Sequence, residues 1–447
     1  MQDGTSKDGK QKRAKSNNEK DYEEDIINQL PDGIPINILA NLPIKEAART
    51  SILSRKWKNL WTYFSGTLEF EGSPIMKDMI KDLKKVTGGR LQMAMEIMYD
   101  AERQTYTSWI NELLSSLQCS TLQGLKFWFP MKNVSDIDNW IHFAVQKKVQ
   151  KLELYFGHTI VYVLPLHIFK VERFNSLCVL RMKSITVTDE MLEYLMCNCQ
   201  LLETLSLVDS RVPKTMKVSG SSLKLKCLEL VRCWELTKIE IFAEKLVSFK
   251  YYGSHLETEF KSVPCLEEAS FGGSFVEFVR ESFLPQIKVL KLDITQNSPE
   301  VIYWLSQLPK LKNLKHLELV ACADDGISAC VMLLKASPSL WRLKIKMLNT
   351  KPTYITEHKF TMECHYNLKE LELVGFCGAA CEVELVMYIL ENTDELQKIT
   401  IDTRLPTKPK LRPLDEEHFE TWDLEEKKRC AWRLKDKIPP CIEFVCL

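Results

Sequence analysis

Glycine is scarce in this chain, with 16 glycines among 447 residues, and neither the GxxxxGK[ST] nor the GxGxxG phosphate-binding pattern occurs. No apolar run approaches the ~18–20 residues that a membrane-spanning helix needs, and the polar N-terminal stretch does not resemble a secretory signal. Lys+Arg and Asp+Glu balance at 60 each, so the chain lacks the positive excess of a dedicated nucleic-acid or membrane-surface binder. We expect a soluble protein of the nucleus or cytoplasm that binds neither nucleic acid nor membrane.

The chain also lacks patterns for metal or enzyme chemistry. Its 15 cysteines are expected to be reduced thiols, and Cys197-x-Cys199 and Cys377-x-x-x-Cys381 stand alone, whereas zinc needs four ligands. HExxH and GxSxG are absent. We therefore expect no metal, no cofactor, no catalytic residue and no enzymatic activity.

The N-terminal segment, residues 1–25, is polar and cannot bury enough apolar surface to offset the entropy of ordering, so we expect it to be disordered. Lys12-Arg13-Ala14-Lys15 fits a short basic nuclear-import pattern, although a solvated tail explains the same residues.

Residues 26–70 form the first candidate domain, with apolar residues at helical spacing in three short stretches. The first stretch contains Ile34, Ile38, Leu39 and Leu42 and ends at Pro43. The second contains Ile52, and the third contains Trp57, Leu60 and Trp61. About forty residues rarely fold alone, so this domain is expected to pack against its neighbour or a partner chain.

A repeat dominates the chain between residues 120 and 405. The pattern apolar-x-x-apolar-x-apolar is typical of the strand in a leucine-rich repeat, and it occurs twelve times. Successive first positions lie between 20 residues (Leu246 to Leu266) and 28 residues (Val149 to Leu177) apart. This spacing predicts a solenoid with a curved parallel sheet and a helical or irregular outer face, which is an α/β fold. The twelve matches begin at Leu122, Val149, Leu177, Leu202, Leu225, Leu246, Leu266, Ile287, Leu314, Leu340, Leu368 and Leu396.

The spacing also predicts what lies around the strands. Returns between 225 and 287 are too short for much helix, whereas the later ones have room for a helix such as 386–392. Residues 71–119 are expected to form a helical linker or N-terminal cap, with Trp109, Ile110, Leu113, Leu114 and Leu117 on one face. Residues 406–447 are expected to form a C-terminal cap with a helix and a terminal strand.

Side-chain alternation identifies candidate target-binding residues, since the residue between the second and third apolar positions faces the concave side. This column has mixed charge, which favours a protein partner over nucleic acid. The next column contains aromatic residues that could be binding anchors or could pack beneath a loop or a neighbouring strand. The candidates are Trp128, Tyr155, Arg181, Lys250, Tyr252 and Lys291.

The residues of the first domain carry a family resemblance. The segment from Gln29 to Tyr63 resembles an F-box in its Leu30-Pro31-Asp32 start, Leu42-Pro43, and Leu53-Ser54-Arg55-x-Trp57-x-x-Leu60-Trp61. With the repeats, the chain is similar to plant F-box/leucine-rich-repeat proteins that often end in an FBD-type region. Asn367-Leu368-Lys369-Glu370-Leu371 and Tyr388–Asn392 carry the FBD-like resemblance over about 360–405. The Cys377–Cys381 loop departs from it, because a more charged loop is expected there.

This resemblance implies that the F-box docks on a Skp-type adaptor and so joins a cullin–RING ubiquitin ligase, while the repeats bind a protein substrate for ubiquitination. The alternative is a leucine-rich-repeat scaffold with a degenerate F-box and no ligase role. Trp61 is expected in the core, whereas Leu30, Pro31 and Leu39 are expected at the adaptor interface. The adaptor-binding or F-box-core residues implied by the resemblance are Leu30, Pro31, Ile34, Ile38, Leu39, Leu42, Pro43, Ile52 and Trp57.

Overall fold

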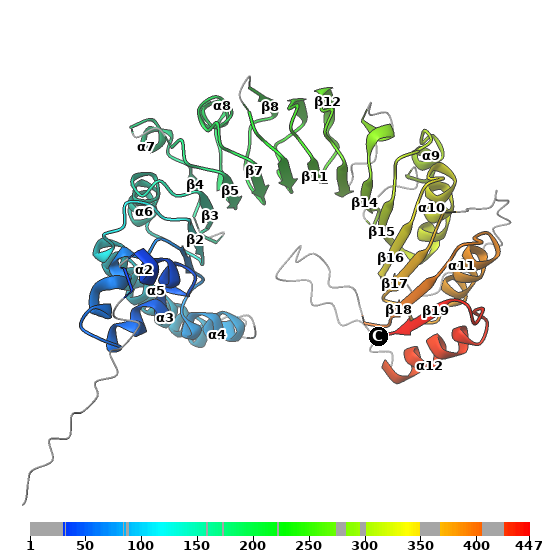
Figure 1. Cartoon of the computed structure of the whole chain (residues 1–447), viewed down its shortest axis with the longest axis horizontal. Helices are drawn as coiled ribbons and strands as arrows, with labels where there is room; N and C mark the ends of the chain where they lie inside the picture. The colour runs from blue at the N-terminus through cyan, green and yellow to red at the C-terminus, as the bar shows by residue number, and fades with distance from the viewer. Residues whose placement is uncertain are drawn as a thin grey trace, which may run out of the picture.

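The computed structural model describes residues 30–404 and 424–447, apart from 32, 84, 86–88, 158–159, 172–173, 221–222, 274–282, 296–300 and 349–366. The chain forms an arc with strands along its inner side and helices along much of its outer side (Figure 1). A small helical domain lies at the N-terminal end, and α12 lies at the other. The tail 1–25, with its basic pattern, falls outside the described residues.

The N-terminal domain consists of two short α-helices and two 3-10 helices. They are α2 (Gly33–Ala40), α3 (Ile44–Arg49), η1 (Thr50–Ile52) and η2 (Trp57–Tyr63). Pro43 precedes α3, where its fixed φ of −59° suits the helix start. The third predicted helix is thus a 3-10 helix, which buries Trp57 and Leu60.

A parallel sheet of 14 strands forms the inner face of the arc. Twelve of its strands coincide with the twelve sequence repeats, and one further strand lies at each end. The second and third apolar residues of neighbouring repeats pair in register, as Leu125 does with Leu152, and both are buried. In sheet order the strands are β1 (Thr67–Phe70), β2 (Gly124–Trp128), β3 (Lys151–Tyr155), β5 (Val179–Lys183), β7 (Thr204–Val208), β9 (Cys227–Val231), β11 (Ser248–Gly253), β13 (Glu268–Gly273), β14 (Val289–Asp293), β15 (His316–Cys322), β16 (Arg342–Leu348), β17 (Glu370–Val374), β18 (Lys398–Asp402) and β19 (Glu443–Cys446).

The outer face follows the repeat length. The longer repeats return through helices, whereas the short central repeats return through β8 (Thr215–Ser219), β10 (Lys238–Phe242) and β12 (Glu257–Ser262), which form their own parallel sheet. Among the described residues, the expectation of little helix between 225 and 287 is confirmed, as is the helix over 386–392. The other outer elements are α6 (Val134–Gln146), β4 (Tyr162–Val163), α7 (Leu166–Val171), β6 (Ile185–Thr186), α8 (Asp189–Asn198), η4 (Leu284–Gln286), α9 (Val301–Ser306), α10 (Ala323–Ala336) and α11 (Ala380–Glu391).

Two helices connect the N-terminal domain with the repeats. These are α4 (Pro74–Leu83) and the 28-residue α5 (Gly89–Ser116). The C-terminal half of α5 buries Ile110 and Leu114 as the sequence predicts. The strand β1 precedes both helices, so the sheet begins earlier than the first recognised repeat. At the other end, α12 (Leu424–Lys435) and β19 close the solenoid.

Candidate protein-binding surfaces

The F-box-like domain leaves large apolar side chains in solvent on α2 and η1. Ile34 and Ile38 are each 45% exposed, and Ile52 is 89% exposed. The helices are too short to bury every apolar residue between them, because Leu39, Ala47 and Trp57 already fill the interior. The exposed residues form an apolar surface of the kind that binds a partner chain.

The nine residues implied by the resemblance divide into contact and core positions. Leu39 is fully buried and Trp57 is 4% exposed, so both are core residues of this domain rather than contact residues. For Leu39, which was expected at the adaptor surface, the reason is the turn of α2 that places Ile38 outward and Leu39 inward. Those at least partly accessible are Leu30, Pro31, Ile34, Ile38, Leu42, Pro43 and Ile52.

The structure adds detail that the pattern did not predict. Leu30 is half-buried, and its carbonyl accepts a hydrogen bond from Lys56 Nζ at 2.5 Å. Because Lys56 directly precedes η2, this bond ties the start of the domain to that helix. Leu53 is 57% exposed next to Ile52 and enlarges the apolar surface. In the sequence, the position of Leu53 directly before Ser54-Arg55 was the signal that could have identified it as an exposed residue. Trp61 packs partly buried against the core, as expected.

The second candidate surface is the concave face of the large sheet. From each strand, two alternate side chains point into the arc. Across the strands they form two rows, which are the two columns identified in the sequence. Lys126, Glu153 and Arg181 share one row across β2, β3 and β5, and Trp128, Tyr155 and Lys183 share the next.

Ion pairs between strands hold many of the concave charges. Lys126 contacts Glu71 at 2.5 Å, and Arg181 contacts Glu153 at 3.0 Å. The hydrogen bond from Lys126, aided by Lys77, lowers the pKa of Glu71. Burial acts to raise the pKa of Glu229, but Lys250 at 2.7 Å outweighs it, so the pKa is lowered. These carboxylates stay ionised and their charges remain paired at neutral pH.

Three of the six target-binding candidates are exposed cations. Arg181 and Lys250 are paired as above, whereas Lys291 has no ion pair among the residues that the structure describes. Trp128 and Tyr155 are half-buried and stack side by side, with ring centroids 5.2 Å apart.

Tyr252 differs from the expectation of an exposed anchor, because it is only 9% exposed. Its ring lies over Gly272 on the neighbouring strand, and its hydroxyl donates a hydrogen bond to Asp293 Oδ2 on the next one at 3.1 Å. The missing side chain at Gly272 makes room for the ring. Tyr252 thus braces three strands rather than waiting for a partner.

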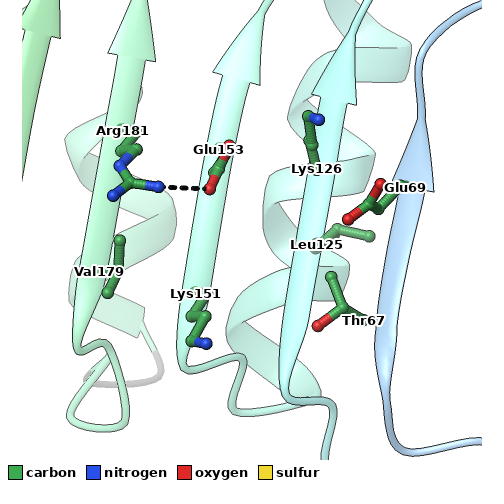
Figure 2. Close-up of a pocket in the computed structure, with 8 residues that line it drawn as sticks. All are labelled: Thr67, Glu69, Leu125, Lys126, Lys151, Glu153, Val179 and Arg181. Carbon is green, nitrogen blue, oxygen red and sulfur yellow. Dashed lines mark hydrogen bonds and ion pairs between the residues drawn. The ribbon is translucent and has the colours of Figure 1, made fainter. Parts of the chain in front are cut away.

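A shallow hollow of about 280 Å³ lies on the concave face near its N-terminal end (Figure 2). Gly124 pairs with Thr67 on one side and Lys151 on the other, so the position between these two lining residues has no side chain. Figure 2 shows charged groups of both signs around the hollow, with Arg181 reaching to Glu153. Its lining residues are Thr67, Glu69, Leu125, Lys126, Lys151, Glu153, Val179 and Arg181.

The described part of the chain was also compared with the requirements of metal sites and membrane spans. No group of three or more His, Cys, Asp or Glu side chains is arranged there to hold a metal ion. None of the helices described is both long and apolar enough to span a membrane. Cys233 is buried, with its Sγ 3.5 Å from the Leu207 carbonyl oxygen, which is a structural position.

A short helical domain with an exposed apolar surface, followed by a parallel leucine-rich-repeat sheet, defines an F-box/leucine-rich-repeat architecture. Comparison with known families agrees with this: the F-box domain model matches residues 27–67, and the model described as "At1g61320/AtMIF1, LRR domain" matches residues 167–438. The second match covers more than half of the chain, which therefore belongs to this leucine-rich-repeat family and carries an F-box before the repeats.

Curated relatives from Arabidopsis thaliana have the same organisation in their names. A putative F-box/LRR-repeat protein, At4g15060, is 27% identical over 73% of this chain and 80% of its own length. The FBD-associated F-box protein At1g66310 is 25% identical over 88% and 92%. The F-box/FBD/LRR-repeat protein At5g22660 is 26% identical over 85% and 90%. The resemblance to plant F-box/leucine-rich-repeat proteins with an FBD-type region is confirmed.

Proposed function

We propose that this protein is the substrate-recognition subunit of a Skp–cullin–F-box (SCF) ubiquitin ligase. The F-box docks a Skp-type adaptor, and through it a cullin–RING ligase, while the concave face binds a protein target. The chain itself is non-catalytic. It raises the effective concentration of the target's lysines near the activated ubiquitin.

The observation that carries this proposal is the exposed apolar surface of the F-box at Ile34, Ile38, Ile52 and Leu53. Water-exposed side chains of this size are costly unless a partner covers them. Because the same domain keeps a complete core of Leu39, Ala47 and Trp57, its fold does not need these residues.

The alternative is a scaffold whose F-box no longer engages a ligase. Protein half-lives in plant cells distinguish the two, measured with the wild-type chain or with Leu30→Ala/Pro31→Ala. A ligase subunit predicts that proteins captured by both chains persist longer with the variant. Equal half-lives would favour the scaffold.

We further propose that the protein works in the nucleus or cytoplasm, where a Lys12–Lys15 import signal would favour the nucleus. Neutral substitution of those basic residues in a fluorescent fusion tests this. Unchanged distribution would contradict the import role.

A further inference from the structure

The N-terminal third of the concave face carries an unusual cluster, which we call the aromatic–cation patch: Lys126, Trp128, Tyr155, Arg181 and Lys183. Its residues lie on three adjacent strands, β2, β3 and β5. Trp128 and Tyr155 stack at 5.2 Å. Lys126 Nζ lies 5.9 Å from the Trp128 ring and Lys183 Nζ lies 4.9 Å from the Tyr155 ring.

The two rings keep accessible surface where Tyr252 does not. Both are half-buried, whereas Tyr252 is only 9% exposed. Aromatic rings held rigidly by neighbours lose little entropy when a partner packs on them, which makes them strong anchors.

The charges around the rings are incompletely balanced. Glu71 contacts both Lys126 and Lys77, and Asp209 contacts both Lys183 and Arg232, while Glu153 contacts Arg181. Five cations thus share three carboxylates. Glu69 and Lys151, the remaining charges of the adjoining hollow, offset each other, so the region carries a net positive charge of two. Lys183 is the least committed cation, at 3.8 Å from Asp209.

A buried polar group lies beside the patch as well. The Tyr99 hydroxyl has no hydrogen-bond partner among the described residues, and Tyr99 is only 7% exposed. Burial raises the pKa of Tyr99 to about 12, with a smaller contribution from the nearby Tyr155. An unpaired donor of this kind is costly until a ligand accepts a hydrogen bond from it.

We propose that the aromatic–cation patch is the main target-reading site, and that it binds an acidic peptide segment of the target with an aromatic or large aliphatic side chain seated on Trp128 and Tyr155. The proposal rests on the target-binding role proposed above. Carboxylates of the segment complement the excess cations. A nucleic-acid strand fits less well, because its evenly spaced phosphates would meet Glu71, Glu153 and Asp209. A second copy of this chain presenting the same patch would oppose like charges.

The test uses the full chain co-expressed with a Skp-type adaptor and fluorescein-labelled probes read by anisotropy. The main probe is a synthetic peptide of acidic residues around one tryptophan. A second peptide has lysine in place of every acidic residue, a third has serine in place of tryptophan, and oligo-dT is the nucleic-acid probe. We expect the first probe to bind at least roughly tenfold more tightly than each of the others, and its binding to weaken with added salt.

Variants then locate the site. Trp128→Ala/Tyr155→Ala is expected to weaken binding of the acidic tryptophan peptide by roughly tenfold or more, and Lys183→Gln by severalfold. Lys346→Gln, on β16 of the same face but outside the patch, and Tyr303→Ala, an exposed tyrosine on α9, are expected to bind as wild type. If the aromatic double variant unfolds, the comparison of Lys183→Gln with Lys346→Gln still decides the matter.

The inference is overturned if no peptide binds, if acidic and basic peptides bind equally, if oligo-dT binds best, or if the variants in the patch bind as wild type. Adaptor co-purification is scored separately in every sample. Loss of the adaptor with retained peptide binding would refute the SCF role and leave the patch standing. Retained adaptor binding without peptide binding would refute the patch and leave the SCF role standing.

Discussion

At the residue scale, the absence of a side chain at Gly272 decides what Tyr252 does. Strand alternation places Tyr252 on the concave side, and the sequence identified that face. It did not reveal that the ring would lie flat, because this depends on a glycine 20 residues later being its neighbour in register. Trp128 and Tyr155 have no such neighbour and remain accessible.

Gly272→Ala is expected to destabilise the protein by about 1–3 kcal/mol through overpacking. The added Cβ would clash with Tyr252 Cε2, so the ring must leave Asp293. The denaturant midpoint measures this, with Gly33→Ala as the matched control, since a Cβ there meets nothing within 4 Å. A Gly272→Ala midpoint equal to that of wild type would contradict the assignment of Tyr252 as a brace.

Glu382 predicts a pH effect with an unusual sign. Its carboxylate accepts hydrogen bonds from the backbone N–H groups of Cys377, Gly378 and Ala379 at 2.8–3.1 Å, yet burial outweighs them and raises its pKa above the ordinary 4.5. The folded state therefore holds this proton more tightly than the unfolded chain, and the contribution to stability falls as pH rises through the raised pKa.

Comparison with Glu382→Gln isolates this effect, since carboxyls with lowered pKa, such as Glu71 and Glu372, act equally in both proteins. We expect the stability of wild type relative to the variant to be greatest below the ordinary pKa of 4.5 and to decline as pH rises through the raised pKa. Denaturant midpoints at several pH values measure it. A difference that grows with pH would show that the three hydrogen bonds dominate instead.

At the element scale, α5 differs in burial along its length. Its C-terminal half buries Ile110 and Leu114, whereas its N-terminal half exposes Leu91, Met93 and Met98 by 60% or more. The sequence predicted the buried face from its spacing. The exposed half keeps apolar residues in solvent although α4 packs against α5, so periodicity alone could not place it.

Ile110→Ala is expected to cost about 2–5 kcal/mol, because it removes a fully buried side chain. Met98→Ser serves as the control and should change stability by less than about 0.5 kcal/mol, as its side chain is 60% exposed. Denaturant midpoints of the two variants check the contrast. A large loss for Met98→Ser would mean that α5 packs differently in solution.

At the scale of the whole molecule, the repeat spacing predicted twelve strands and the change of the outer layer in the centre of the arc. It did not predict β1, because Ser65 occupies the position where the repeat pattern requires an apolar residue before Leu68 and Phe70. The end strands have one neighbour each and are therefore less constrained. The sequence could identify the two candidate binding surfaces only as faces of the F-box and of the sheet. Which residues are accessible on them, such as exposed Ile38 beside buried Leu39, depends on how the short helices pack.

We propose that the apolar surface of the F-box joins this chain to a ligase. Co-purification with a Skp-type adaptor tests it most directly, for wild type, for Ile34→Ser/Ile38→Ser, and for Ile97→Ser as a control from another exposed apolar position. We predict a stoichiometric complex with wild type and with Ile97→Ser, and none with the double variant. All three substituted side chains are exposed, so the variants should fold, and a lost complex reports a lost contact. A double variant that retains the adaptor, or a wild-type chain that does not bind it, would contradict the claim.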